Sequence, residues 1–104
     1  MKEWKPLAEA GDTDAQYNLG IMYDEGQGVP QDYQESAKWY KLVAEQGYPE
    51  AQRHLALLYY EGKGVPQDYQ EAVKWMTLAA NQGDVGSQYN LGSVSYTHLR
   101  AHET

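Results

Sequence analysis

The chain has 104 residues and a formal net charge of −7, with Lys+Arg 8 against Asp+Glu 15. An acidic chain without a basic cluster has no electrostatic footprint for nucleic acid or for an anionic membrane surface, so neither is expected as a partner. The lack of cysteine excludes disulfides, thiolate metal sites and cysteine nucleophiles. No apolar run approaches the roughly 20 residues of a membrane helix, no signal-like segment is present, and the compartment, cytoplasmic or exported, stays open.

The chain is built on an internal repeat of 36 residues. The sequence GVPQDYQE occurs at Gly28–Glu35 and again at Gly64–Glu71, and residues 13–48 and 49–84 are identical at 20 of 36 positions. Such self-similarity is typical of repeat architectures. The predicted division is the end of a preceding repeat over residues 1–12, whole repeats over 13–48 and 49–84, and the start of a third repeat over 85–93.

The first predicted element is the helix that ends the preceding repeat. Because proline suits the first turn of a helix but not its interior, this helix is predicted to begin at Pro6. A second helix is predicted over Asp14–Asp24. Its apolar face has helical spacing and consists of Ala15, Leu19, Met22 and Tyr23. Gly20 lies beside this face, where its lack of a side chain is expected to permit close helix approach.

A turn and a third helix complete the repeat. Two glycines and a proline break the helical pattern over Glu25–Gln31. Asp32 is then a predicted N-cap, with Glu35 three residues later as in a capping box. The helix is predicted to run to about Gln46, and Gly47 to adopt the left-handed conformation after it. One such hairpin cannot bury its own apolar faces, so neighbouring hairpins are expected to stack.

The repeat resembles the Sel1-like repeat, a relative of the tetratricopeptide repeat with a longer hairpin turn. The positions that carry the resemblance are Ala15, Leu19, Gly20, Tyr23, Gly26, Gly28, Val29, Asp32, Ala37, Trp39, Tyr40, Ala44, Gln46 and Gly47. It covers Met1–Ser93 and departs from the family pattern at Pro6. The resemblance implies an all-α fold, a right-handed α-solenoid of antiparallel helix hairpins. A bacterial source is expected, and the organism stays open.

The resemblance also implies a non-catalytic scaffold that binds a protein or peptide, without cofactor or metal. The first helix of each repeat would line the concave surface, and positions there that differ between copies would contact the partner. These predicted groove residues are Asp14, Tyr17, Ile21, Asp24, Glu50, Arg53, Leu57, Tyr60 and Tyr89. Two alternatives stay open. The residues are simply variable and exposed, or the repeats are a regulatory arm of a larger enzyme or signalling protein whose catalytic domain lies outside this fragment.

Three further features suggest chemistry, namely a histidine pair, a glycine turn and two recurring tryptophans, but a structural role explains each of them better. His98 and His102 have the spacing of two metal ligands on a helix, but no third ligand is evident. The glycine turn at 26–28 follows no strand and lacks the ending of a phosphate-binding loop. Trp39 and Trp75 recur with the repeat, which favours packing over ligand stacking. No catalytic, cofactor or metal site is predicted.

Residues 94–104 do not continue the repeat. The register would place tyrosine at 95, glycine at 98 and 100, and valine at 101, whereas the chain has Ser95, His98, Arg100 and Ala101. The segment resembles a translated transposase adapter from sequencing libraries. We therefore predict a metagenomic reading frame with a non-native tail, so that the natural sequence after Ser93 is missing. A natural capping helix is the alternative, and the nucleotide sequence of the gene decides between them.

Overall fold

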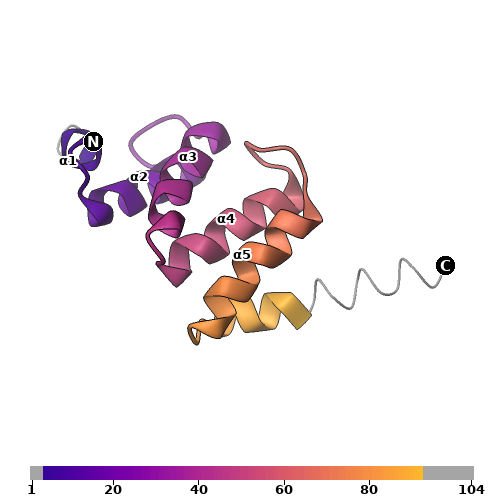
Figure 1. Ribbon diagram of the computed structural model, residues 1–104. Helices are drawn as coiled ribbons and strands as arrows, with labels where there is room; N and C mark the ends of the chain where they lie inside the picture. The colour runs from indigo at the N-terminus through magenta and orange to yellow at the C-terminus, as the bar shows by residue number, and fades with distance from the viewer. Residues whose placement is uncertain (1–3, 93–104) are drawn as a thin grey trace.

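The computed structural model of the protein describes residues 4–92, and this part of the chain is helical and contains no strand (Figure 1). The helices are α1 (Trp4–Glu9), α2 (Thr13–Glu25), α3 (Tyr33–Glu45), α4 (Pro49–Glu61) and α5 (Tyr69–Asn81). A further helical segment covers 85–92. The predicted hairpins are therefore α2 with α3 and α4 with α5.

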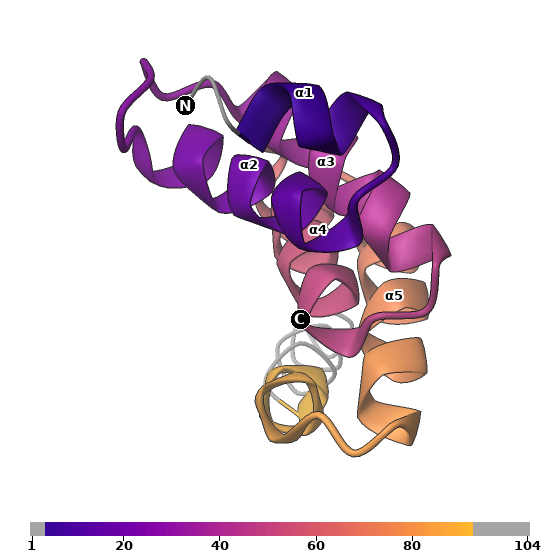
Figure 2. The same ribbon diagram turned by 90° about the vertical axis from the view of Figure 1, so that its left-hand side faces the viewer.

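Each helix packs against its neighbours in the chain. Contacts join α1 to α2, α2 to α3, α3 to α4, and α4 to α5. Figure 2 shows the resulting layers, which run from α1 and α2 through α4 and α5 to the segment 85–92. This stacking is what repeats require, because each hairpin buries its apolar faces only against the next one.

The helix boundaries follow local signals. The carboxylate of Asp32 accepts hydrogen bonds from the backbone N–H groups of Gln34 (3.0 Å) and Glu35 (3.2 Å), as expected of an N-cap. The second half of the predicted capping box differs. The Asp32 N–H donates to the Tyr23 carbonyl at 2.9 Å, and Glu35 instead pairs with Lys38 at 3.2 Å.

The start of the first helix differs from the prediction. The helix already includes Trp4, two residues before Pro6. Pro6 is thus the third residue of α1, where no backbone N–H is needed because the first turn has no intrahelical acceptors. Gly47 has φ 99°, which confirms the predicted left-handed residue after α3.

The predicted apolar face forms the interior of the stack. Leu19 and Leu55 are fully buried, while Tyr23 and Tyr59 are half-buried against the same clusters. Trp39 and Trp75 are also buried, and a lysine ammonium lies 4.8 Å from the centroid of each ring. The tryptophans therefore pack between helices, as their recurrence predicted.

Gly20 provides the close approach that the sequence indicated. A Cβ atom at Gly20 would lie 2.6 Å from Cδ1 of Tyr40, inside contact distance. The equivalent pair in the next repeat is Ala56 and Met76, both fully buried. A flexible methionine leaves room for a methyl group where the tyrosine ring does not.

A recurring glutamine links each repeat to the one before it. The side-chain amide of Gln16 donates to the carbonyl of Ala8 at 3.0 Å. The equivalent bonds run from Gln52 to Ala44 and from Gln88 to Ala80, each at 3.1 Å. The first two bonds are buried, where an unpaired carbonyl at a helix end is costly, so they fix one helix against the last turn of its predecessor.

Candidate protein-interaction surface

The nine predicted groove residues all lie on the first helix of a repeat, on α2, α4 or the segment 85–92. Asp14, Glu50 and Tyr89 are exposed, Tyr89 at 76%. The other six are half-buried: Tyr17, Ile21, Asp24, Arg53, Leu57 and Tyr60. Half-buried members carry part of the packing, so the exposed members are the ones freely available to a partner.

Four of the half-buried residues belong to the edge of the core. Tyr17, Ile21, Leu57 and Tyr60 pack against the larger buried cluster. The ring of Tyr60 also meets that of Tyr69, with centroids 5.2 Å apart. Substitutions at these positions therefore change the stability of the fold as well as the surface.

An aromatic stack connects the first two repeats. The His54 ring lies parallel to Tyr40 with centroids 4.9 Å apart, and Tyr17 is tilted against both. Burial lowers the pKa of His54 below 6.5, and the nearby Arg53 acts in the same direction. Burial likewise raises the pKa of Tyr40, whose hydroxyl donates to Asp24 at 3.3 Å. His54 is thus a neutral packing residue at pH 7.

Arg53 is engaged within the chain. Its Nε lies 3.2 Å from Oδ2 of Asp84, and the two side chains are only 27% and 10% exposed. The other carboxylate oxygen of Asp84 accepts from the Ser87 N–H at 3.3 Å, which caps the helical segment 85–92. The pair therefore joins the second repeat to the start of the third.

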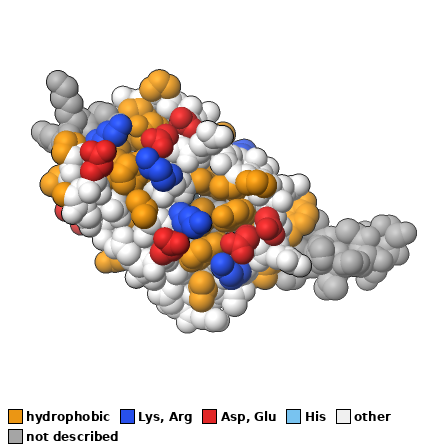
Figure 3. Space-filling view, turned by 45° about the horizontal axis from the view of Figure 1, so that its top comes forward, with side chains coloured by type: hydrophobic (Ala, Val, Ile, Leu, Met, Phe, Trp, Pro, Cys, Tyr) orange, Lys and Arg blue, Asp and Glu red, His pale blue; other side chains and the backbone are white. Residues whose placement is uncertain are grey.

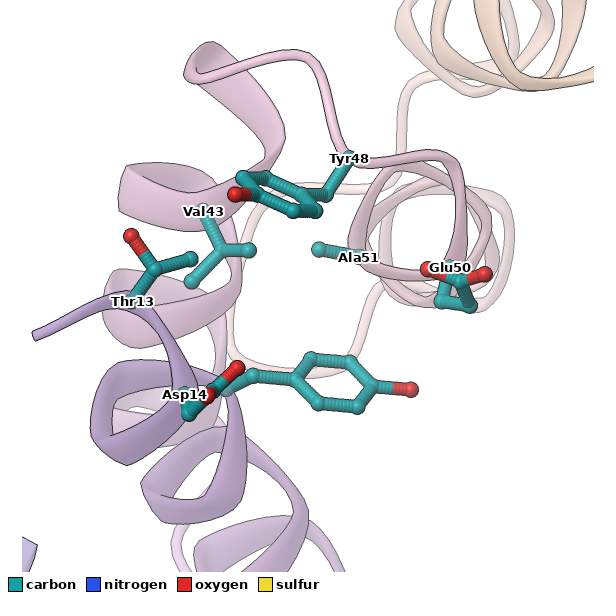
Figure 4. A pocket seen from close by; sticks show the side chains of 7 residues that line it. Thr13, Asp14, Val43, Tyr48, Glu50 and Ala51 are labelled. Atoms are coloured by element: carbon teal, nitrogen blue, oxygen red, sulfur yellow. The ribbon is translucent and has the colours of Figure 1, made fainter. Parts of the chain in front are cut away.

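A pocket of about 230 Å³ opens between α2 and α4 (Figure 4). Its lining consists of Thr13, Asp14, Tyr17, Val43, Tyr48, Glu50 and Ala51. Figure 4 shows Asp14 and Glu50 on opposite sides of the opening and Tyr48 next to Val43. Burial raises the pKa of Tyr17 above 10, so the hydroxyl stays protonated at pH 7.

Sequence reasoning found three of the seven lining residues, namely Asp14, Tyr17 and Glu50. Tyr48 is not among the predicted residues, because the prediction rests on helix positions and Tyr48 lies in the link before α4. A signal was nevertheless present, since the equivalent residue in the next copy is Asp84. Link positions that differ between the repeats therefore indicate junction residues, just as variable helix positions do.

One face of the molecule carries charges of both signs (Figure 3). On the face in Figure 3, Lys or Arg side chains lie beside Asp or Glu and are interspersed with hydrophobic groups. In the described part of the chain, no group of three or more His, Cys, Asp or Glu residues could hold a metal ion. None of the helices described is long and apolar enough to cross a bilayer. His98, His102 and the predicted tail 94–104 lie outside the described residues.

Comparison with known families identifies the repeat. Residues 13–48, 49–84 and 85–101 each match the Sel1 repeat, so the chain belongs to the Sel1 repeat family. The third match reaches residue 101 and overlaps the segment predicted to be non-native. No curated protein sequence matches the chain significantly.

Solved structures show the same fold. A protective antigen of uropathogenic Escherichia coli strains, which displays an SLR fold, superposes with TM-score 0.87 and 44% identity over 91% of this chain and 20% of its own. A Sel1 repeat protein from Oxalobacter formigenes superposes with TM-score 0.80 and 34% sequence identity, over 90% of this chain and 38% of its own. Cysteine rich protein B of Helicobacter pylori superposes with TM-score 0.78 and 23% sequence identity, over 86% of this chain and 68% of its own. This likeness is one of fold alone. The chain thus spans less than two fifths of the first two relatives.

These matches confirm the predicted all-α solenoid of helix hairpins. Sel1 repeat proteins are generally protein-interaction scaffolds, and the fold is typically non-catalytic.

Proposed function

We propose that this chain binds a protein or peptide across the face formed by α2, α4 and the segment 85–92, by presenting a shaped surface and without turnover. The supporting observation is the pocket between α2 and α4, which is lined by three of the nine predicted groove residues. Core positions of a repeat are held constant by packing, so variable residues gathered around a hollow are suited to a specific partner.

The composition of this face also suits recognition. Tyrosine supplies a large contact area that loses little conformational entropy on binding, and it is enriched at binding hot spots. Tyr17 and Tyr48 line the pocket, and Tyr89 is exposed further along the same face. Exposed Asp14 and Glu50 add fixed charges that orient a ligand.

The experiment is a selection of peptides from a random display library on the purified chain, followed by affinity measurement on variants. One triple variant removes the exposed face residues through Asp14→Ala, Glu50→Ala and Tyr89→Ala. A matched control removes two carboxylates and one apolar side chain from α1 and α3 through Glu9→Ala, Glu45→Ala and Leu42→Ala.

We expect the face variant to weaken selected peptides by about tenfold or more, a loss of roughly 1.4 kcal/mol, and the control to change affinity by less than about twofold. Circular dichroism of both variants reports whether the fold is retained. Failure to select any peptide, or an equal loss in the control, contradicts the proposed function.

A further inference from the structure

The repeat allows the pocket to be compared with the equivalent place one unit later. At an offset of 36 residues, the position equivalent to Tyr17 is Arg53, that equivalent to Tyr48 is Asp84, and that equivalent to Glu50 is Gly86. We call the contact around Tyr17, Tyr48 and Glu50 the first junction, and that around Arg53, Asp84 and Gly86 the second junction. They are two versions of the same structural site.

The second junction is filled by an arginine of the chain itself. The guanidinium of Arg53 pairs with Asp84 at 3.2 Å, and a Cβ atom on Gly86 would lie 2.9 Å from Cδ of Arg53. The arginine stem therefore lies directly over Gly86. The glycine makes room for the side chain, and the carboxylate holds its charged end.

The first junction has no such side chain and contains the pocket of about 230 Å³. Since a water molecule occupies about 30 Å³ in the liquid, this volume corresponds to roughly eight waters. A guanidinium group with part of its aliphatic stem fits such a space. The first junction thus has room for what the second junction already holds.

The lining of the first junction suits a planar cation. Cations are attracted to aromatic faces, and arginine in particular stacks on them. Tyr17 and Tyr48 provide the rings, and Asp14 and Glu50 provide carboxylates, which form strong hydrogen bonds with guanidinium groups. Carboxylates and aromatic faces together favour arginine over a neutral side chain.

Neighbouring positive charges do not cancel this preference. Arg53 is close enough to influence Tyr17, but its charge is balanced by the ion pair with Asp84. His54 packs against Tyr17 and is neutral at pH 7, because burial lowers its pKa. The net charge of −7 adds a general attraction for cations.

We propose that the pocket at the first junction binds an arginine side chain of the partner, beside the rings of Tyr17 and Tyr48 and the carboxylates of Asp14 and Glu50. This inference rests on the proposed function and specifies the chemistry of its ligand. The partner is accordingly a polypeptide segment that presents a basic residue toward α2 and α4.

The first experiment titrates the chain with N-acetyl-arginine amide and follows backbone amide signals by NMR. N-acetyl-citrulline amide is the matched control, because it has nearly the same shape and no charge. We expect the arginine compound to shift signals of residues 13–17 and 48–51 and to bind at least fivefold more tightly than the citrulline compound. Equal binding of both compounds, or no shift in these residues, overturns the inference.

Variants separate the pocket from general electrostatics. Asp14→Asn with Glu50→Gln removes two charges at the pocket, and we expect at least a fivefold loss of arginine binding. Glu9→Gln with Glu45→Gln removes two charges from exposed sites on α1 and α3, and should leave binding within twofold. A similar loss in both would show non-specific attraction and overturn the proposal.

A third variant reproduces the second junction at the first. Tyr17→Arg, Tyr48→Asp and Glu50→Gly supply an internal arginine, its carboxylate and the glycine beneath it, so arginine binding should be lost while the helices are retained. Undiminished binding contradicts the proposal.

Substituting citrulline for each arginine of the selected peptides is the last test. A loss of at least fivefold at one position supports the inference. If peptides bind the face without any need for arginine, or if only the free compound binds, the inference fails while the proposed function stands.

Discussion

The two junctions show how one repeat fold yields two different surfaces. At the second junction, Arg53 and Asp84 close the contact from within the chain. At the first, Tyr17 and Tyr48 occupy the same positions and leave a pocket. The glutamine bond to the preceding helix is common to both, from Gln52 to Ala44 at the first junction and from Gln88 to Ala80 at the second. The difference between the two surfaces therefore resides in a few junction positions, while the constant positions keep the stack intact.

The largest expected change in the free energy of unfolding comes from substitutions in the two hairpin turns. Gly28 and Gly64 share a left-handed conformation, with φ 75° and 77°. A Cβ atom on Gly64 would collide with the backbone of Tyr33, whereas on Gly28 it would meet only Cε of Met22, at 3.5 Å. Gly28→Ala should cost about 1–2 kcal/mol from backbone strain, and Gly64→Ala about 1–3 kcal/mol more from the collision.

Urea unfolding followed by circular dichroism measures the difference. Equal costs for the two substitutions would mean that the second turn does not pack on α3 as described.

A smaller loss of stability is expected within the first hairpin, where α2 packs against α3. Gly20→Ala places a methyl group against the Tyr40 ring and should destabilise the protein by about 1–2 kcal/mol, because the collision exceeds the helix-propensity gain of an alanine. Adding Tyr40→Met copies the Ala56 and Met76 pair of the next repeat and should recover part of this loss. A double-mutant cycle without favourable coupling would refute the explanation.

The ion pair of the second junction is expected to contribute about 1 kcal/mol, because partial exposure limits its strength. Arg53→Met keeps the aliphatic stem and removes the charge, so hydrogen exchange should become faster in residues 85–92 and stay unchanged around the pocket. Glu61→Gln, which affects the exposed pair with Lys63, is the control. Unaltered exchange in 85–92 would show that the pair does not hold the third repeat.

The smallest effect is a dependence of stability on pH. Burial lowers the folded-state pKa of His54 below its unfolded value of about 6.5. The folded state therefore binds protons less readily, so stability is fully present above pH 6.5 and declines as the pH falls through the folded pKa. The groups that act on His54 are Arg53, Asp24, Asp84 and Glu50, together with the rings of Tyr17 and Tyr40.

The control is His54→Asn, because asparagine stands at the equivalent positions 18 and 90. Between pH 7 and pH 5, the urea midpoint of unfolding should fall further in the unsubstituted chain than in this variant. An identical fall in both would assign the pH dependence to other groups.

Sequence reasoning predicted the helices and their order because their signals are local. Asp32 caps a helix through bonds to residues two and three positions later, and Gly47 ends it within the same turn. The buried face of Leu19 and Tyr23 follows from helical spacing alone. Such features need no knowledge of distant parts of the chain.

The candidate site depends on contacts between residues far apart in sequence. Arg53 and Asp84 are 31 positions apart, and the pocket brings Thr13 to Ala51. No local pattern shows that Arg53 is engaged by the chain while Tyr17 borders an open space. Aligning the repeats on the structure makes this difference visible, because equivalent positions then occupy equivalent junctions.

Hydrogen exchange of the chain with and without a saturating selected peptide tests the central claim most directly, namely that the first junction is the open one. The account predicts new protection in residues 13–17 and 48–51 and little change at Arg53 and in 84–87. Protection confined to α3 and α5, or centred on the Arg53–Asp84 pair, would contradict it.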